Sequence, residues 1–408
     1  MSIPRRLPMN CPKLPRSIVA LGLVSLFMDM SSEMIHSLLP VFLVTVLGAS
    51  ALSVGFIEGI AEATASIAKV FSGVISDWMG RRKPLVLLGY GLAALTKPLF
   101  PLATGIGAVL TARFIDRIGK GIRGAPRDAL IADITPPEIR GAAYGLRQTL
   151  DTVGAFAGPL LAMALMAATQ DNFRLVFWMA VIPAFICVLL IIFGVKEPEI
   201  TRPATHPTIK IRPIRRENLR RLAPRFWWLV AFAAVLTCAR FSEAFLLLRA
   251  ENVGMAVTWV PTVLIVMNIV YAASAYPFGK LSDNGGRRRL LPWGIGFLIA
   301  SDLVLALASS IWLVSLGAAL WGLHMGATQG LLSALVADAA PADLRGTAFG
   351  VFNLASGLAL LAASVIAGGL WTAFGPEMTF YAGAAFATLA LIGLLSGLNT
   401  RKSEQHLS

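Results

Sequence analysis

The 408-residue sequence predicts an all-α membrane protein in which twelve transmembrane helices form two pseudo-symmetric six-helix bundles. Three observations support this prediction. Hydrophobic residues make up 56% of the chain and charged residues only 14%, whereas average soluble proteins have about 45–50% and about 25%. Apolar runs long enough to cross about 30 Å of hydrocarbon as helices recur along the whole chain. Two motifs of the first half also return in the second half.

The apolar runs set the expected helices. They are continuously apolar and rich in Leu, Ala and Gly, without the alternation that lipid-facing strands need, so helices are expected rather than a barrel. The predicted spans are 17–47, 51–77, 84–104, 106–128, 141–168, 174–195, 226–249, 256–282, 290–309, 311–338, 346–371 and 377–398.

Basic residues are concentrated in every second loop between these spans. They lie before the first span, after the second, between the sixth and seventh, after the eighth and after the twelfth, for example at Arg16, Arg81, Arg225, Arg288 and Arg401. The intervening loops have almost no Lys or Arg, so both termini are expected in the cytoplasm of a multi-pass protein of the cell (inner) membrane. The net charge of +13 thus comes from basic loops that indicate the orientation of the chain in the membrane. No nucleic-acid partner is expected, because the basic residues form no aromatic-interleaved patch.

A proline-containing polar segment divides the chain near its middle. We expect a cytoplasmic tail at 1–16, an amino-terminal bundle at 17–197, a cytoplasmic linker at 198–225, a carboxy-terminal bundle at 226–398 and a cytoplasmic tail at 399–408. Two motifs repeat across this division. Gly73-Val-Ile-Ser-Asp77-Trp-Met-Gly80-Arg81-Arg82 recurs as Gly279-Lys-Leu-Ser-Asp283-Asn-Gly-Gly286-Arg287-Arg288, shifted by 206 residues. Ala129 to Asp133 with Arg140 recurs as Ala334 to Asp338 with Arg345, shifted by 205. Internal repeats of this kind are typical of secondary transporters.

The loop after the second span carries a recognisable pattern. Its GxxSDxxGRRK sequence at 73–83 resembles the signature loop of the major facilitator superfamily, and the resemblance covers the whole chain. Arg113 stands at the place of the family's helix-four arginine. Gly154-x-x-x-Gly158-Pro159 is similar to a signature associated with proton-coupled antiporters. The resemblance therefore implies a transporter that works by alternating access, with drug or metabolite efflux as the expected direction.

The resemblance also implies a conformational gate at the cytoplasmic ends of the helices. Asp77 and Arg81 are expected to pair with neighbouring helix ends when this side is closed, and favourable carboxylate–helix contacts would bias a two-state equilibrium. Plain anchoring of the loop is the alternative. The predicted gating residues are Gly73, Asp77, Gly80, Arg81, Arg82, Asp133, Arg140, Gly154, Gly158, Pro159, Asp283 and Arg287.

Ionisable residues inside the predicted spans are the candidates for the transport pathway. Charges at membrane depth are costly and mark functional sites by default. In the first span such residues are spaced by four and three positions, so they share one helix face. We expect them to line a wet central cavity. The predicted substrate and proton pathway consists of Asp29, Glu33, His36, Glu58, Glu62, Arg113, Asp116, Arg117, Asp151, Arg240 and Glu243.

Proton coupling needs a carboxyl group that takes up and releases a proton on alternate sides. Glu33, Asp29 and Glu62 are the best candidates, since no cation is expected within a helical turn of Glu33. Asp116 is interpreted first as a structural ion pair with Arg113 or Lys120 on adjacent turns, with a substrate or proton role as the alternative. His36 is expected to be a hydrogen-bonded packing residue, with a ligand or proton role as the alternative.

The leading hypothesis is proton-driven export of a small organic solute by a monomer that needs the lipid bilayer and protons but no cofactor or metal. Uptake or exchange of an organic anion is an alternative, favoured by Arg113, Arg117, Lys120 and Arg147. Divalent-metal export through Asp29, His36, Cys238 and His324 is another, because their oxygen, nitrogen and sulfur donors suit a transition metal. A membrane enzyme or a solute receptor is a further alternative. An enzyme is not expected, since no nucleophile elbow, phosphate loop or metal-hydrolase motif occurs.

Overall fold

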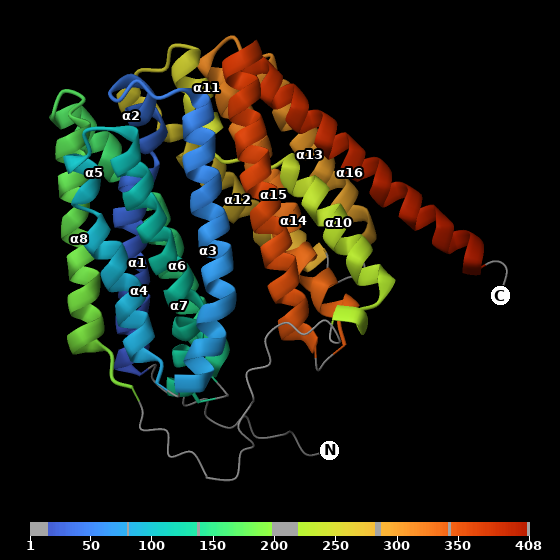
Figure 1. The fold of residues 1–408 in the computed structure, drawn as a ribbon, viewed down its shortest axis with the longest axis horizontal. Helices are drawn as coiled ribbons and strands as arrows, with labels where there is room; N and C mark the ends of the chain where they lie inside the picture. Colours follow the sequence, from blue (N-terminus) through green and yellow to red (C-terminus); the bar gives the residue numbers. More distant parts are fainter. Residues whose placement is uncertain are drawn as a thin grey trace, which may run out of the picture.

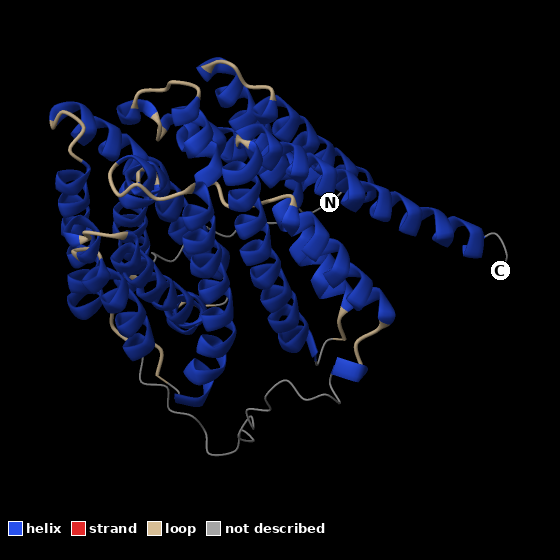
Figure 2. Cartoon of the chain, turned by 45° about the horizontal axis from the view of Figure 1, so that its top comes forward, coloured by secondary structure: helices blue, strands red, loops and turns tan. Residues whose placement is uncertain are grey.

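The computed structural model describes residues 15–79, 81–136, 139–197, 219–281, 287–341 and 344–405. The residues in these ranges are almost all helical and include no strand (Figure 2). The all-α prediction is therefore confirmed. Most of the predicted tail at 1–16 and most of the linker at 198–225 lie outside the described residues.

The helices of the first half follow the predicted order (Figure 1). They are α1 (Arg16–His36), α2 (Leu39–Thr45), α3 (Ala51–Met79), α4 (Lys83–Thr96), α5 (Leu99–Leu102), α6 (Ile106–Ile134), α7 (Arg140–Ala168) and α8 (Phe173–Gly194). Local signals set several of their ends. Pro84 stands in the first turn of α4, where its missing N–H costs nothing. The Asn172 side chain caps α8 by accepting the Leu175 N–H at 3.1 Å.

The second half continues with a matching set of helices. They are α10 (Pro224–Cys238), α11 (Ala244–Asn252), the short 3₁₀ helix η2 (Val257–Trp259), α12 (Thr262–Leu281), α13 (Arg287–Ala306), α14 (Ile311–Ala339), α15 (Arg345–Phe374) and α16 (Pro376–Gln405). Ser310 caps α14 by accepting the Leu313 N–H at 3.4 Å.

Among the described residues, nine helical segments are long and apolar enough to cross a membrane, and two shorter apolar helices are α10 and Leu290–Ala306. The predicted span at 106–128 lies on α6, which is not among these segments. Its charged residues explain the difference, because they break up every long apolar stretch of the helix: Arg113, Asp116, Arg117, Lys120, Arg123, Arg127, Asp128 and Asp133. With 29 residues, α6 is still long enough to cross about 30 Å of hydrocarbon.

Three runs that the sequence predicted as continuous helices are interrupted. The run at 17–47 breaks between α1 and α2, 84–104 breaks between α4 and α5, and 226–249 breaks between α10 and α11. Prolines account for two of these breaks, since Pro40 and Pro98 have no backbone N–H to donate. In the third, the Ser242 hydroxyl accepts the Ala244 N–H at 3.2 Å and starts a new helix. The breaks at Ser37 and Ser242 are 205 residues apart, which is the offset of the sequence repeat.

We call the end of the molecule that carries residues 46–50, 169–172 and 253–256 the upper end. The two halves meet there through α2 on α11 and α7 on α12 and η2, and they also meet along α3 and α15, whose packing runs from Gly368 beside Ala51 to Gly350 beside Val70 (Figure 1). The Leu52 N–H donates to the Thr372 hydroxyl at 3.3 Å, and the Thr258 hydroxyl hydrogen bonds to Asp171. We call the opposite end, with residues 81–82 and 135–136, the lower end.

Two glycines let the backbones of α3 and α15 come together at the upper end. A Cβ at Gly55 would overlap the Ser364 carbonyl oxygen, and one at Gly368 would lie 2.5 Å from the Ala51 carbonyl oxygen. Only glycine allows so close a helix approach. The halves are therefore held together by backbone packing that a side chain would prevent.

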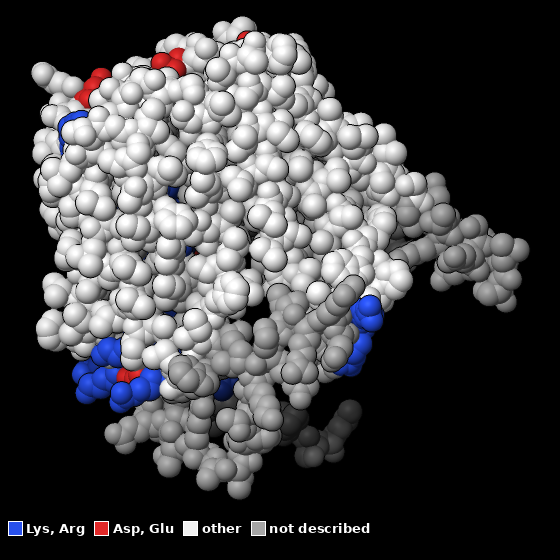
Figure 3. All heavy atoms as spheres, in the orientation of Figure 1, with Lys and Arg blue, Asp and Glu red and all other residues white. Residues whose placement is uncertain are grey.

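Charge separates the two ends in the way the loops predicted. In Figure 3, Lys and Arg gather along the lower edge and Asp and Glu at the upper edge. Exposed basic residues of the lower end include Arg16, Arg81 and Lys196, whereas Asp171 and Glu377 are exposed at the upper end. The lower end is thus the basic face.

Candidate functional site

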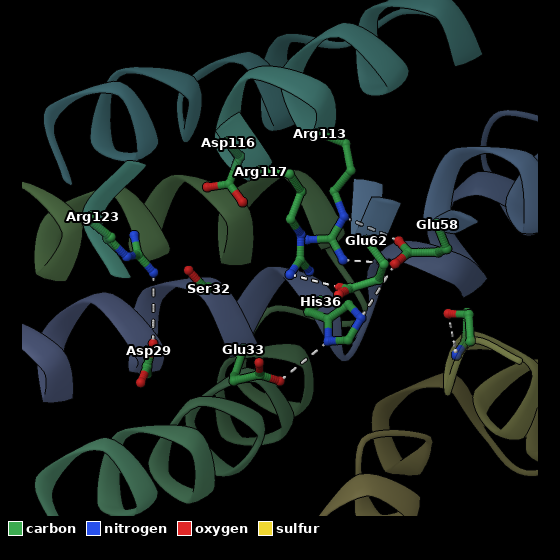
Figure 4. A network of polar contacts seen from close by, with 12 residues as sticks. Asp29, Ser32, Glu33, His36, Glu58, Glu62, Arg113, Asp116, Arg117 and Arg123 are labelled. Atoms are coloured by element: carbon green, nitrogen blue, oxygen red, sulfur yellow. Dashed lines mark hydrogen bonds and ion pairs between the residues drawn. The ribbon is translucent and has the colours of Figure 1, made fainter. Parts of the chain in front are cut away.

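A network of charged side chains fills the interior of the first half. It joins α1, α3, α6 and α7, and it includes nine of the eleven predicted pathway residues. Eight of them are labelled in Figure 4, namely Asp29, Glu33, His36, Glu58, Glu62, Arg113, Asp116 and Arg117, and the ninth is Asp151 on α7. Helical spacing explains the convergence, because residues three and four positions apart share one face. The structure therefore brings most of the predicted residues into one cluster, and their role in a transport pathway stays a prediction.

The most buried pair of the network is Glu58 on α3 with Arg113 on α6. Arg113 Nη2 lies 2.8 Å from Glu58 Oε2 and its Nε lies 3.2 Å from Oε1. The side chains of Arg113 and Glu58 are only 3% and 1% exposed. Such a bidentate pair fixes the geometry of both groups. It leaves neither charge free for a solute, so Arg113 holds α3 to α6.

Asp116 also forms a buried ion pair, but with a residue that the sequence did not indicate. Its Oδ1 accepts a hydrogen bond at 3.0 Å from Nζ of Lys97, which follows α4, and Lys97 donates to the Ser32 hydroxyl at 3.1 Å. The expected partners Arg113 and Lys120 were wrong. Arg113 is taken up by Glu58, and the interruption of the third span at Lys97-Pro98 points the lysine into the bundle.

Four other carboxylates are partly open to solvent although they come from helices inside the bundle. The exposed side-chain fractions are 26% for Asp29, 27% for Glu33, 33% for Glu62 and 22% for Asp151. Arg117 Nη1 lies 2.8 Å from Glu62 Oε1. Charged groups at this depth that keep part of their surface exposed border water rather than lipid. These four acids therefore line the accessible part of the network.

Asp29 and Asp151 lie at the junction of α1 with α7. Asp29 Oδ1 is 4.0 Å from Arg123 Nη2, and Asp151 Oδ1 is 3.2 Å from Arg147 Nη2. Arg127 Nη1 also lies 4.0 Å from Asp151 Oδ1. Both carboxylates therefore lie beside arginine side chains of α6 or α7.

His36 connects the exposed and buried parts of the network. Its Nδ1 is 3.4 Å from Glu33 Oε2, and its Nε2 is 3.6 Å from Glu58 Oε2. The expectation that no cation lies within a turn of Glu33 was therefore wrong, since His36 can carry charge one turn away. His36 is hydrogen bonded as predicted, and it links Glu33 to the Glu58–Arg113 pair.

Two glycines of α7 bring that helix against α1 beside Glu33. A Cβ at Gly158 would lie 2.7 Å from the Glu33 Cβ and 2.7 Å from the Met30 carbonyl oxygen, and one at Gly154 would overlap the Leu26 carbonyl oxygen. Pro159 lies inside α7. The Gly154-x-x-x-Gly158-Pro159 segment thus makes the close α1–α7 packing that sets the position of Glu33.

The other two predicted pathway residues lie in the second half. Arg240 and Glu243 lie in the break between α10 and α11 rather than on one helix, so their predicted helical placement was wrong. Arg240 lines a cavity of about 250 Å³ between the halves. The residues that line the cavity are Ser66, Ala233, Thr237, Arg240, Leu332, Phe352, Asn353, Ser356, Gly357 and Leu360.

The predicted gate is described only in part. Arg82 Nε lies 3.3 Å from Asp133 Oδ2 and its Nη1 donates to the Ser76 hydroxyl at 2.7 Å. Gly80 and Asp283 lie outside the described residues, and the side chains of Asp77 and Arg287 are likewise not described. Gly73 packs against Ala125, Arg81 is exposed, and Arg140 donates to the Thr135 carbonyl at 3.3 Å. The described contacts between this loop and neighbouring helix ends are made by Arg82, next to the expected Arg81, and by Lys83, whose Nζ donates to the Val195 carbonyl at 2.6 Å.

The ligand set proposed for a divalent metal does not assemble. Within the described parts of the chain, no group of three or more His, Cys, Asp or Glu side chains could hold a metal ion. His324 is fully buried, with Nδ1 2.7 Å from the Gly294 carbonyl oxygen, while His36 contacts Glu33 and Glu58. Metal export through Asp29, His36, Cys238 and His324 is therefore not supported.

One buried acid lies away from this network. Asp302 on α13 is fully buried, and neither of its carboxyl oxygens has a hydrogen-bond partner. Its Oδ2 occupies the space beside Gly383 of α16, where an added Cβ would lie 2.6 Å from it. An acid at such a site must enter the bundle either as an unpaired charge or after taking up a proton, and both cost free energy at neutral pH.

We expect Asp302→Asn to raise the free energy of unfolding by about 1–3 kcal/mol, because the amide carries neither cost. The neighbouring Ser301→Ala is the matched control. It removes a hydroxyl that donates to the Gly317 carbonyl at 2.7 Å and should instead lower stability by about 0.5–1.5 kcal/mol. Denaturant unfolding of the purified protein measures both, and a loss of stability in the Asp302 variant would contradict the expectation.

Comparison with known proteins agrees with this architecture. A family profile described as Major Facilitator Superfamily matches residues 21–267 and 241–407. The uncharacterized MFS-type transporter MJ1317 of Methanocaldococcus jannaschii is 34% identical over 395 residues, which cover 95% of this chain and 96% of that protein. The multidrug resistance protein MdtH of Photorhabdus laumondii is 31% identical over 144 residues, 35% of each chain.

A solved structure has the same fold. The crystal structure of a mutant of the nucleoside transporter NupG matches with a TM-score of 0.79 at 12% identity, covering 93% of this chain and 99% of that chain. The interrupted helices, the repeat and the interior charges are therefore parts of a twelve-helix membrane transporter and not of an enzyme. The chain belongs to the major facilitator superfamily.

Proposed function

We propose that this protein is a proton-coupled exporter of a small organic solute, such as a drug or metabolite, and that it works by alternating access. The observation that carries the proposal is the set of partly exposed interior carboxylates, Asp29, Glu33, Glu62 and Asp151. Each of these carboxylates lies beside a basic side chain, and protonation of the carboxylate would break that ion pair. A proton on the carboxyl group can therefore replace the basic partner, whose own charge is then free to pair with another group or with water.

Alternating access gives these acids contact with each side of the membrane in turn. The two halves touch at the upper end through α3 and α15, and rocking about this contact is the usual motion of proteins with two related bundles. The Glu33–His36–Glu58 chain supports coupling between protonation and that motion. Loss of a proton from His36 would weaken its ion pairs with Glu33 and Glu58, and the contact with Glu58 connects α1 to α3.

The direction and orientation rest on separate observations. Export is supported by the Gly154-x-x-x-Gly158-Pro159 segment packed beside Glu33 and by the partial similarity to a multidrug resistance protein. The basic lower face supports a cytoplasmic lower end, with both termini in the cytoplasm and the protein in the cell (inner) membrane. We propose that it functions as a monomer, with the proton gradient as its energy source and no cofactor.

The test is Glu33→Gln in proteoliposomes that contain a pH-sensitive dye. A compound library screened for solute-induced proton release from wild-type vesicles identifies transported solutes. We expect the variant to lose proton-coupled flux at least about tenfold, the loss typical of removing a group that transfers protons. Exchange of solute for solute needs no net proton movement and should persist.

Glu251→Gln is the control for this experiment, because Glu251 lies at the upper end in α11, outside the charged network. It should keep wild-type proton release. An unchanged pH dependence of flux in Glu33→Gln would remove Glu33 as the proton carrier. Absence of proton movement with every transported solute would overturn the coupling itself.

A further inference from the structure

We propose that the cavity beside Arg240 binds the carboxylate of a small organic anion, so that the solute carried by this protein is an organic anion. This inference rests on the proposed transport function and adds the substrate class. Its central observation is the position of Arg240. The residue lies in the α10–α11 break, is half-buried, and lines the 250 Å³ cavity between the two halves.

Arg240 differs from the arginines of the first-half network in having no carboxylate oxygen within 4.0 Å among the described residues, and Glu243 acts on it only through a longer-range charge interaction. Arg113, Arg117, Arg123, Arg127 and Arg147 each have a carboxylate oxygen within 4.0 Å. Within the described ranges no carboxylate forms such an ion pair with Arg240, and Glu243 is not among the residues that line the cavity. A guanidinium inside the membrane that no carboxylate contacts directly is costly unless a further group compensates it.

The lining of the cavity offers both polar groups for a carboxylate and apolar side chains for an organic body. Asn353 and Ser356 of α15, with Ser66 of α3, offer hydrogen-bonding groups beside Arg240. A guanidinium binds a carboxylate through two parallel hydrogen bonds, which gives both strength and orientation.

The lining also includes the apolar side chains of Phe352, Leu332 and Leu360. A volume of about 250 Å³ lies just below the range of roughly 300–1,000 Å³ in which drug-sized ligands bind. The cavity therefore fits a compact organic acid better than a large drug.

The cavity also lies where a bound anion would influence both halves. Ser66 is one helical turn from Glu62 on the same face of α3, while Arg240, Asn353 and Ser356 belong to the second half. Glu62 is one of the partly exposed acids and is paired with Arg117. An anion on Arg240 thus lies one turn from a proposed proton-pathway carboxylate, which gives a short physical link between solute and proton.

The experiment measures binding of three probe series to the purified full-length protein. Each series contains a carboxylate, the corresponding primary amide and the corresponding amine of one body, for example benzoate, benzamide and benzylamine. Isothermal titration calorimetry should give at least about a tenfold preference for one or more carboxylates over their amides, in line with a charge-assisted hydrogen bond. Arg240→Gln should abolish this preference, and Arg240→Lys should retain part of it.

Arg225→Gln is the matched control, because Arg225 is exposed at the lower end of the same α10 helix. It should bind the carboxylates like the wild type. If no carboxylate is preferred over its amide, or if Arg240→Gln keeps the preference, the inference is overturned. Should Arg240→Gln fail to fold, Asn353→Ala provides the second test and should weaken carboxylate binding several-fold.

This outcome is separable from that of the proposed function. Proton release driven by neutral solutes, without carboxylate preference, would remove the anion site and leave the proton coupling intact. Conversely, Arg240-dependent carboxylate binding without proton movement would retain the anion site and remove the coupling.

Discussion

Arg113→Met is expected to lower the free energy of unfolding by about 3–5 kcal/mol, because it leaves Glu58 buried without its partner. Glu58 is 1% exposed, and the guanidinium of Arg113 supplies two of its hydrogen bonds. The remaining neighbour, His36, lies 3.6 Å away and is shared with Glu33. The helices α3 and α6, which the pair connects, should therefore separate more easily in the variant.

The double variant Arg113→Met with Glu58→Leu distinguishes an unpaired charge from lost packing. Replacing both members of a buried ion pair with apolar residues is often nearly neutral for stability, so the double variant should recover most of the loss. Unfolding of the purified protein in mixed micelles measures each step, with exposed Arg225→Met as a control near the wild-type value. If the double variant is as unstable as Arg113→Met alone, the unpaired charge of Glu58 is not the cause of the lost stability.

Gly368→Ala is expected to weaken the closure of the upper end. The added Cβ would lie 2.5 Å from the Ala51 carbonyl oxygen and 2.8 Å from the Leu52 Cα, and backbone atoms cannot move aside as a flexible side chain can. Overpacking of this kind costs about 1–3 kcal/mol, which corresponds to a shift of roughly 5- to 150-fold in a two-state equilibrium. Transport should slow, because one of the two states becomes scarce.

Gly369→Ala is a control one residue away, since nothing lies within 4 Å of a Cβ at that position. Spin labels at Thr104 and Ser309, which are exposed upper-end residues of the two halves, report the opening in a cysteine-free background. Gly368→Ala should add a longer distance that is absent from the wild type and from Gly369→Ala. Identical distance distributions in all three proteins would contradict the role assigned to this contact.

The sequence predicted the fold well because its main determinants are local. Long apolar runs, alternating basic loops and the repeat at 205–206 residues together require a twelve-helix membrane protein of two related halves. The interruptions at Ser37 and at 239–243 were missed, since the residues on both sides are as apolar as those of a continuous helix. The one available signal was the position of Pro40 three residues after Ser37.

The candidate site was predictable as a group of residues but not as a set of pairs. The rule that intramembrane charges are functional identified nine members of the network, and the same rule applied to Lys97, Arg123, Arg127 and Asp302 would have found four more charged interior residues. It could not assign partners. Lys97 reaches Asp116 only because α4 packs against α6, and Asn353 of the cavity carries no charge to mark it.

The recurrence of the break in the first helix of each half has a mechanical consequence. Beyond each break the chain continues as a short piece, seven residues in α2 and nine in α11, and these two pieces pack on each other. We expect these two short helices to act as a gate, with hinges at Ser37 and Ser242. Tilting of these two short segments would then add to the movement of the halves when the upper end opens, while the long helices that carry the charges keep their internal geometry.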